Sequence, residues 1–223
     1  MRIISLFLIL ISTSWLTAQE VVEVRNEKRH KPVFQNQYVR LLDVWINPGD
    51  TSLFHRHALP SIFVFLTRAE IGTQILGQGK IPLSTVVGQT WYAGYENGAQ
   101  VHRAWTAGAV PLHAIDIELL FGKKKLDATG VARLVHPELR FISEHPLARI
   151  YNLELGPYQS AQIESNGNPG VLVCWQGERL MVQSDKQSLI SQGEFQWWSG
   201  SRSILLTNNS SGNHKVYFYE LLK

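Results

Sequence analysis

Two histidines separated by a single residue, His55 and His57, are the side chains of this sequence best placed to do chemistry. They end the stretch Pro48–His57, in which a Pro-Gly-Asp turn precedes a segment typical of a β-strand. Side chains at positions i and i+2 of a strand point to the same face, so both imidazoles face the same way. Nitrogen ligands lie about 2.0–2.1 Å from a metal, and the pair can therefore share one ion.

A third histidine, His102, lies in a second glycine-rich stretch, Gly88–Gly108. If the two stretches pack side by side, three imidazole nitrogens cap one face of a divalent metal ion and leave other positions open. We therefore predict a metal site of His55, His57 and His102 that holds Fe, Zn, Mn or Ni, because residue spacing does not choose between these ions. Four further histidines have no partner at ligand spacing, and no role is predicted for them: His30, His113, His136 and His145.

Three residues downstream are candidates for a pocket beside these histidines. Phe63 and Phe65 alternate along the strand expected to leave the site, so both are predicted to line the pocket. Gln74 is a candidate for the pocket wall and for an additional ligand, although its repetition as Gln183, described below, favours a scaffold role. Arg56 lies between the two histidines and is expected to face away from them.

The elements that must position these side chains are short strands. The chain has 223 residues, 44% hydrophobic and 17% charged, which is enough for a substantial core. From Tyr38 onward, short apolar runs alternate with Gly, Pro and Asn, and this rhythm predicts an all-β sandwich or barrel. The expected strands are Val39–Ile46, Ile62–Leu66, Gly72–Leu76, Gln89–Tyr92, Gln100–Trp105 and Leu112–Phe121. Residues 20–31 are expected to be extended or loosely held, and Asp127–Leu134 is expected to form a short helix in a connecting segment.

The second half of the chain repeats the first. Offset by 109 residues, Val39–Gln74 aligns with Ala148–Gln183 without a gap, and the apolar strands coincide. The last strands of the two halves both end in Glu-Leu-Leu. In this register Glu164 takes the place of His55 and Asn166 that of His57, so the second copy is predicted to keep the scaffold and to lack the three-histidine site.

These residues resemble the cupin superfamily, whose first motif is G-x5-H-x-H-x3,4-E-x6-G and whose second is G-x5-P-x-G-x2-H-x3-N. Gly49, His55 and His57 match the opening of the first motif, and Gly88, the turn around Gly94–Gly98 and His102 resemble the second. The motif glutamate and proline are missing, and Thr106 replaces the motif asparagine. The resemblance therefore carries over a three-histidine site without the acidic ligand, as in cupins similar to thiol dioxygenases.

The resemblance implies a bicupin, two double-stranded β-helix (jelly-roll-like) barrels on one chain. The expected division is residues 1–18, a signal peptide; 19–125, the N-terminal barrel; 126–147, a linker; and 148–223, the degenerate C-terminal barrel. It also allows a homodimer, because paired barrels in cupins often associate through their edge strands.

Composition and the first residues suggest where the protein acts and on what. Met1-Arg2, the apolar run Ile3–Leu16 and the small residue Ala18 are typical of a cleaved secretory signal, so export to the periplasm or the extracellular space is expected. The formal charge of +3 is too weak and scattered for nucleic acid, and no later stretch is apolar enough to span a membrane. Cys174 is the one cysteine, so no internal disulfide forms.

The leading hypothesis is an exported metal-binding bicupin that oxidises a small organic molecule in a dioxygenase-like reaction. Cupins also include isomerases, lyases, decarboxylases and binding proteins, so fold alone does not settle activity. One alternative is a non-catalytic small-ligand-binding or structural cupin. Another is a zinc-dependent lyase or hydrolase, for which Glu96 is the acidic residue expected nearest the site.

Overall fold

A computed structural model describes residues 20–121 and 131–222 of the chain. The described residues form strands and one short 3-10 helix, η1 (Val24–Asn26), which confirms the predicted all-β class. None of the described helices is long and apolar enough to cross a membrane. The expected signal peptide lies outside the described residues.

The first barrel consists of two five-stranded sheets. One has the order β1-β4-β9-β6-β7 and the other the order β2-β3-β10-β5-β8. Their strands are β1 (Val21–Glu23), β2 (His30–Gln35), β3 (Val39–Ile46), β4 (Phe54–His57), β5 (Ser61–Phe65), β6 (Glu70–Ile75), β7 (Lys80–Ser84), β8 (Thr90–Ala93), β9 (Gln100–Thr106) and β10 (Leu112–Leu119).

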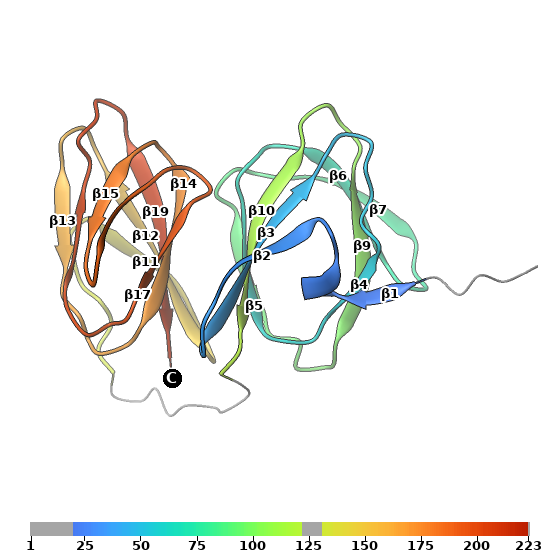
Figure 1. The fold of residues 1–223 in the computed structure, drawn as a ribbon, viewed down its shortest axis with the longest axis horizontal. Coiled ribbons are helices and arrows are strands. Elements are labelled where there is room, and N and C mark those ends of the chain that lie inside the picture. The colour runs from blue at the N-terminus through green and yellow to red at the C-terminus, as the bar shows by residue number, and fades with distance from the viewer. Residues whose placement is uncertain (1–19, 122–130, 223) are drawn as a thin grey trace, which may run out of the picture.

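The second barrel repeats this plan with a five-stranded sheet, β11-β12-β19-β14-β17, and a four-stranded sheet, β13-β18-β15-β16. Its strands are β11 (Leu139–His145), β12 (Ala148–Leu155), β13 (Ser160–Ile163), β14 (Gly170–Gln176), β15 (Leu180–Gln183), β16 (Gln187–Ile190), β17 (Phe195–Trp198), β18 (Ile204–Thr207) and β19 (His214–Leu221). Figure 1 shows the two barrels side by side, with β3, β10 and β5 of the first nearest the second.

Alternation along the strands explains how the barrels pack. On β3, Leu42, Val44 and Ile46 point into the first barrel, whereas Val39 and Leu41 point out of it. The outward residues join an apolar cluster that also contains Ile150 and Val171 of the second barrel. The central strands β3 and β10 are therefore buried on both faces over most of their length.

The internal repeat is visible in the strand registers. Strands β3 and β12 coincide residue for residue at the predicted offset of 109. Arg40 of β3 pairs with Glu118 of β10, and Arg149 of β12 pairs with Glu220 of β19, so the two Arg–Glu pairs occupy equivalent places. In the first barrel, Arg40 Nη1 lies 2.6 Å from Glu118 Oε2.

The connecting segment differs from the prediction in two respects. Strand β11 pairs with β12, so the second barrel begins within the segment 126–147 that was expected to be a linker. Residues 127–130 of the expected helix Asp127–Leu134 lie outside the described residues, and residues 131–134 are not helical. An edge strand was missed there because its alternation of half-buried and exposed residues gives only a weak apolar pattern.

Candidate metal centre

The structure brings the three predicted ligands together inside the first barrel. His55 and His57 lie on β4, and His102 lies on β9 directly opposite His55. The ring centroids of His55 and His102 are 4.5 Å apart, and His57 is 5.0 Å from each of them. Strands β4 and β9, which are far apart in sequence, thus bring three imidazoles together inside the barrel.

A fourth imidazole, that of His30, joins this cluster. Its ring centroid lies 4.3 Å from that of His55, and nitrogen atoms of His30, His55 and His57 all lie within 4.8 Å of one another. The prediction that His30 has no role at the site is therefore wrong. His30 reaches the cluster because β2 pairs with β3, opposite Val44, and no local spacing signals that pairing.

One ring nitrogen of each of three histidines faces an oxygen, and this fixes which nitrogen is left for a metal. Nδ1 of His55 lies 2.9 Å from the carbonyl oxygen of Leu53, which can only accept, so Nδ1 carries the proton and Nε2 has a free lone pair. Nδ1 of His30 lies 3.0 Å from Glu27 Oε2, and Nδ1 of His102 lies 3.3 Å from Thr73 Oγ1. Among the described residues, Nε2 of His55 and Nε2 of His102 are buried without a hydrogen-bond partner.

His57 faces a carboxyl group in place of a main-chain oxygen. Its Nδ1 lies 3.6 Å from Oδ2 of Asp116, and neither of these two atoms makes a hydrogen bond of normal geometry among the described residues. Asp116 is fully buried on β10. Its burial, together with the charge of Glu118, raises the pKa of Asp116 well above the usual range.

Burial keeps three of these histidines, His55, His57 and His102, neutral. Loss of hydration, with repulsion between neighbouring imidazoles, lowers the pKa of His55 to about 3, that of His57 to about 2 and that of His102 to about 4. Neutral imidazoles are the form that binds metal ions. His55, His57 and His102 therefore need no deprotonation to bind a metal at neutral pH.

Glu27 ties the N-terminal segment to the cluster. Its side chain is fully buried and accepts hydrogen bonds from His30 Nδ1, from the main-chain nitrogen of Arg29 and from the main-chain nitrogen of Leu53. Burial opposes its ionisation, but these hydrogen bonds outweigh it and lower the pKa of Glu27 to about 2. The side chain of Arg29 in turn donates two hydrogen bonds to the carboxylate of Asp50. Residues 20–31, expected to be extended or loosely held, include the extended strand β1 and are held in place by these contacts.

The four imidazoles lie at an apolar cavity of about 230 Å³. Phe63 and Phe65 line it as predicted, and Trp91 stacks on Phe63 at 4.9 Å. Tyr95 also lines the cavity and stacks on His57 at 5.9 Å. Its backbone has φ of +54°, a left-handed conformation that costs free energy in a residue with a side chain.

Two residues predicted near the pocket lie outside it. Gln74 does not line the cavity: its Oε1 accepts a hydrogen bond from Arg103, and its Nε2 donates to the carbonyl of Gln78. Its neighbour Thr73 points inward instead, because side chains alternate along β6. Glu96 does not line the cavity either, and Asp116 is the carboxyl group that faces His57.

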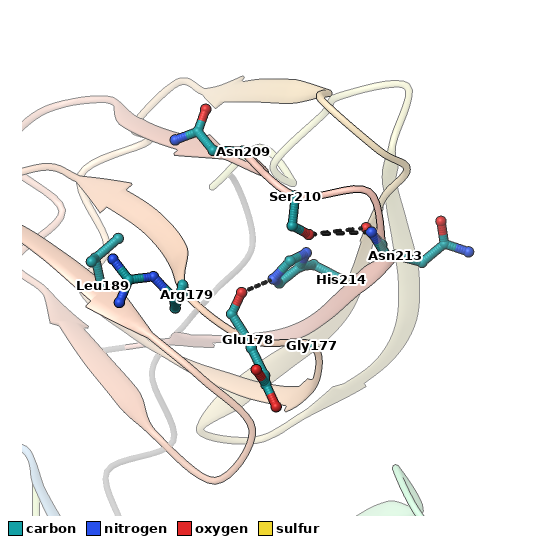
Figure 2. Close-up of a pocket in the computed structure, with 9 residues that line it drawn as sticks. Gly177, Glu178, Arg179, Leu189, Asn209, Ser210, Asn213 and His214 are labelled. Carbon is teal, nitrogen blue, oxygen red and sulfur yellow. Dashed lines mark hydrogen bonds between the residues drawn. The ribbon is translucent and has the colours of Figure 1, made fainter.

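The second barrel has no equivalent cluster among the residues that the structure describes. Its interior is filled by large side chains, including Tyr151, Trp198 and Phe218. A groove at one end contains one histidine, His214, whose Nε2 hydrogen-bonds the carbonyl oxygen of Glu178 at 2.7 Å (Figure 2). That histidine has no second imidazole beside it in the groove.

The donor set of the first barrel fits a divalent transition metal ion. His55 and His102 present buried nitrogens that none of the described side chains or main-chain groups satisfies, and a buried polar atom left unpaired costs free energy. Clustered neutral imidazoles with hydrogen-bonded Nδ1 atoms are the arrangement found around metal-ligating histidines. His30, His55, His57 and His102 are the residues that would hold the ion.

Solved structures share this fold at low sequence identity. AerE from Microcystis aeruginosa aligns with a TM-score of 0.58 and 13% identity, over 88% of this chain and 99% of that one. A cupin 2 conserved barrel domain protein from Leptotrichia buccalis aligns with a TM-score of 0.52 and 10% identity, over 86% and 88% of the two chains. A variant of salicylate 1,2-dioxygenase from Pseudoaminobacter salicylatoxidans, in complex with gentisate, aligns with a TM-score of 0.58 and 11% identity, over 84% and 71%.

No family model matches the sequence, and no curated protein matches it. The similarity is therefore one of fold. It confirms the cupin-type barrels that the resemblance of the histidine motifs implies. The chain has the fold of a bicupin, two cupin barrels in tandem, and the histidine cluster lies in the first.

Proposed function

We propose that the first barrel binds one divalent transition metal ion and catalyses dioxygenase-like oxidation of a small neutral organic molecule. The observation that carries the proposal is the convergence of four imidazoles at one apolar cavity. The fold shared with a salicylate 1,2-dioxygenase supports the reaction class. Fold alone does not determine activity, so the proposal depends on the site itself.

The ligand set favours some of the predicted metals over others. Imidazole suits Fe, Ni, Cu and Zn, whereas Mn is better suited by carboxylate and water. Four imidazoles would complete a tetrahedral zinc site, but they would leave two positions of a six-coordinate ion open. Iron is therefore our first choice, and when bound it would supply the redox chemistry that dioxygen requires.

The protein's own side chains would bind the organic molecule and exclude water. Phe63, Phe65 and Trp91 form an aromatic wall against which a flat or apolar molecule can pack. The cavity of about 230 Å³ lies below the usual range of ligand pockets, roughly 300–1,000 Å³, so the substrate is small.

The cavity wall also limits the charge of the substrate. No Lys, Arg, Asp or Glu lines the cavity among the described residues, and the side chains with polar groups there, besides the histidines, are Thr73, Trp91, Tyr95 and Gln100. A carboxylate in an apolar cavity without a cation pays a large desolvation cost. We therefore expect a neutral substrate such as a phenol, unlike the gentisate of the related structure.

Export is part of the proposal and rests on residues 1–18, whose sequence is typical of a signal peptide. Expression with the native N-terminus, followed by N-terminal sequencing of the secreted and cell-associated fractions, tests it. Mature protein that begins near Gln19 outside the cytoplasm supports export, and intact cytoplasmic protein contradicts it.

The activity is tested by oxygen uptake with iron-loaded, tag-free protein and matched pairs of neutral phenols and benzoates. We expect uptake with a neutral phenol, none with the corresponding benzoate, and none with His57→Ala. The control Asp43→Asn alters an Asp–His contact on the outer face of the same barrel, with 2.8 Å between Asp43 and His113, and should retain activity. Ligand binding that survives metal removal, without turnover on any loaded metal, would instead identify a binding protein.

A further inference from the structure

The internal repeat identifies one polar residue that the barrel scaffold does not need. Asp116 on β10 lies opposite Leu42 and Phe63. In the second barrel, Phe218 on β19 lies opposite Tyr151 and Leu172, which are the repeat equivalents of Leu42 and Phe63. Asp116 and Phe218 are therefore equivalent positions, and the barrel without the histidine cluster has an apolar side chain there.

Other polar positions of the same strand are retained in both barrels. Glu118 and its equivalent Glu220 each lie beside a buried arginine, Arg40 and Arg149 respectively. These acids belong to the scaffold, since both copies have them. Asp116 differs, because it is present only in the copy that carries the histidines.

The buried carboxyl group of Asp116 also lowers the stability of the folded protein. It is fully buried, neither carboxyl oxygen makes a hydrogen bond of normal geometry among the described residues, and the nearby Ser61 hydroxyl offsets only part of the cost of burial. A buried polar group without a partner destabilises the folded state. A residue that lowers stability, and that the duplicated scaffold replaces by phenylalanine, is best explained by a role at the site.

The group that Asp116 faces is His57. The separation of 3.6 Å between Asp116 Oδ2 and His57 Nδ1 becomes a hydrogen bond with a small rotation of the imidazole, and His57 Nδ1 has no other partner among the described residues. Nδ1 atoms of His30, His55 and His102 already have oxygen neighbours. Asp116 would complete this pattern for the fourth histidine.

We propose that Asp116 is a positioning residue for His57: its carboxyl group accepts the Nδ1–H of His57 and turns Nε2 toward the shared metal site. This inference rests on the proposed metal binding. Partners of this kind fix the tautomer and orientation of metal-ligating histidines, and their loss typically lowers metal affinity about 10- to 100-fold.

The test compares metal affinity and metal-free stability in Asp116→Phe, which installs the residue of the second barrel, and in Asp116→Asn. We expect Asp116→Phe to lower affinity for Fe(II) or Zn(II) roughly 10- to 100-fold while the melting temperature of the metal-free protein stays equal or rises. Asp116→Asn retains an accepting oxygen and should lose less affinity. Asp43→Asn is the matched control, because it alters an Asp–His contact on the outer face of the same sheet, and its affinity should be unchanged.

A metal-free measurement gives a second readout. Long-range ¹H–¹⁵N spectra of the imidazoles should show His57 protonated at Nδ1 in the wild type and a shift toward the other tautomer in Asp116→Phe. Unchanged affinity and an unchanged His57 tautomer in Asp116→Phe would overturn the inference and leave the metal site standing. A wild type that binds no metal would overturn the proposed function and this inference together.

Discussion

Ala93 and Trp198 occupy the same place in the two barrels. Ala93 pairs with Ser61 across β5 and β8, and Trp198 pairs with Gly170, the repeat equivalent of Ser61, across β14 and β17. Ala93 lines the open cavity beside the histidines, whereas the fully buried Trp198 packs on Phe218 in a filled core. One position in the repeat thus contributes to whether the barrel has a cavity or a solid interior.

Ala93→Trp should close the first cavity. A side chain of that size would occupy space beside Phe63 and Trp91, so binding of a small neutral ligand should fall more than about 10-fold while metal content stays at the wild-type level. Isothermal titration with the best neutral phenol checks ligand binding, and elemental analysis checks the metal. Ala93→Ser is the size control, and ligand binding that persists in Ala93→Trp would show that the cavity is not the binding site.

Glu27→Gln should weaken the site through His30. The amide cannot accept all the hydrogen bonds of the carboxylate from His30, Arg29 and Leu53, so we expect a loss of about 1–3 kcal/mol of unfolding free energy. Metal affinity should also fall, as His30 loses its fixed orientation. Denaturant unfolding and metal titration measure both. The control is Glu23→Gln, which alters an exposed ion pair with Arg56 and should change stability by less than about 0.5 kcal/mol.

The metal-free protein should lose stability in acid. Each of His55, His57 and His102 has a pKa in the folded state below its unfolded value, so the unfolded chain takes up protons first as the pH falls below about 6.5. Each histidine then costs up to about 1.4 kcal/mol per pH unit. Glu27 adds to the loss below about pH 4.5, because its pKa is lowered to about 2.

Denaturant unfolding at several pH values checks this acid sensitivity. A His55→Gln/His57→Gln double variant should lose less stability between about pH 7 and pH 5 than the wild type does. Equal stability of the metal-free wild type at those two values would mean that the histidines are not buried as a neutral cluster.

Cys174 should be unreactive in the folded protein. Burial raises the pKa of its thiol to about 12, so the thiolate is scarce near neutral pH. We expect negligible labelling by a thiol reagent in native buffer and full labelling in concentrated guanidinium chloride. Above about pH 9 the unfolded thiol ionises and the folded one does not, so this group favours unfolding there. Rapid native labelling would contradict the packing of β14.

The sequence predicted the parts of the site that local spacing determines. The i, i+2 arrangement of His55 and His57 places both on one face of β4, and the repeat offset of 109 residues correctly predicts the equivalent strands β3 and β12. The alternation of Phe63 and Phe65 placed both in the cavity wall for the same reason.

The missed parts depend on tertiary pairing. His30 joins the cluster through β2, whose pairing with β3 includes a register shift that no local pattern reveals. Gln74 and Thr73 are adjacent, so a one-residue error in deciding which faces inward exchanges them. Asp116 lies in an apolar run of β10, where sequence alone does not distinguish a buried acid from an exposed one.

We propose above all that the histidine cluster of the first barrel holds a metal ion. The most direct test is elemental mass spectrometry of tag-free protein, purified with and without supplied Fe(II), Zn(II) and Ni(II), beside a His55→Ala/His57→Ala variant. We predict about one metal ion per wild-type chain and none in the folded variant. The absence of metal from the wild type under every loading condition, or equal metal content in the variant, would contradict the account.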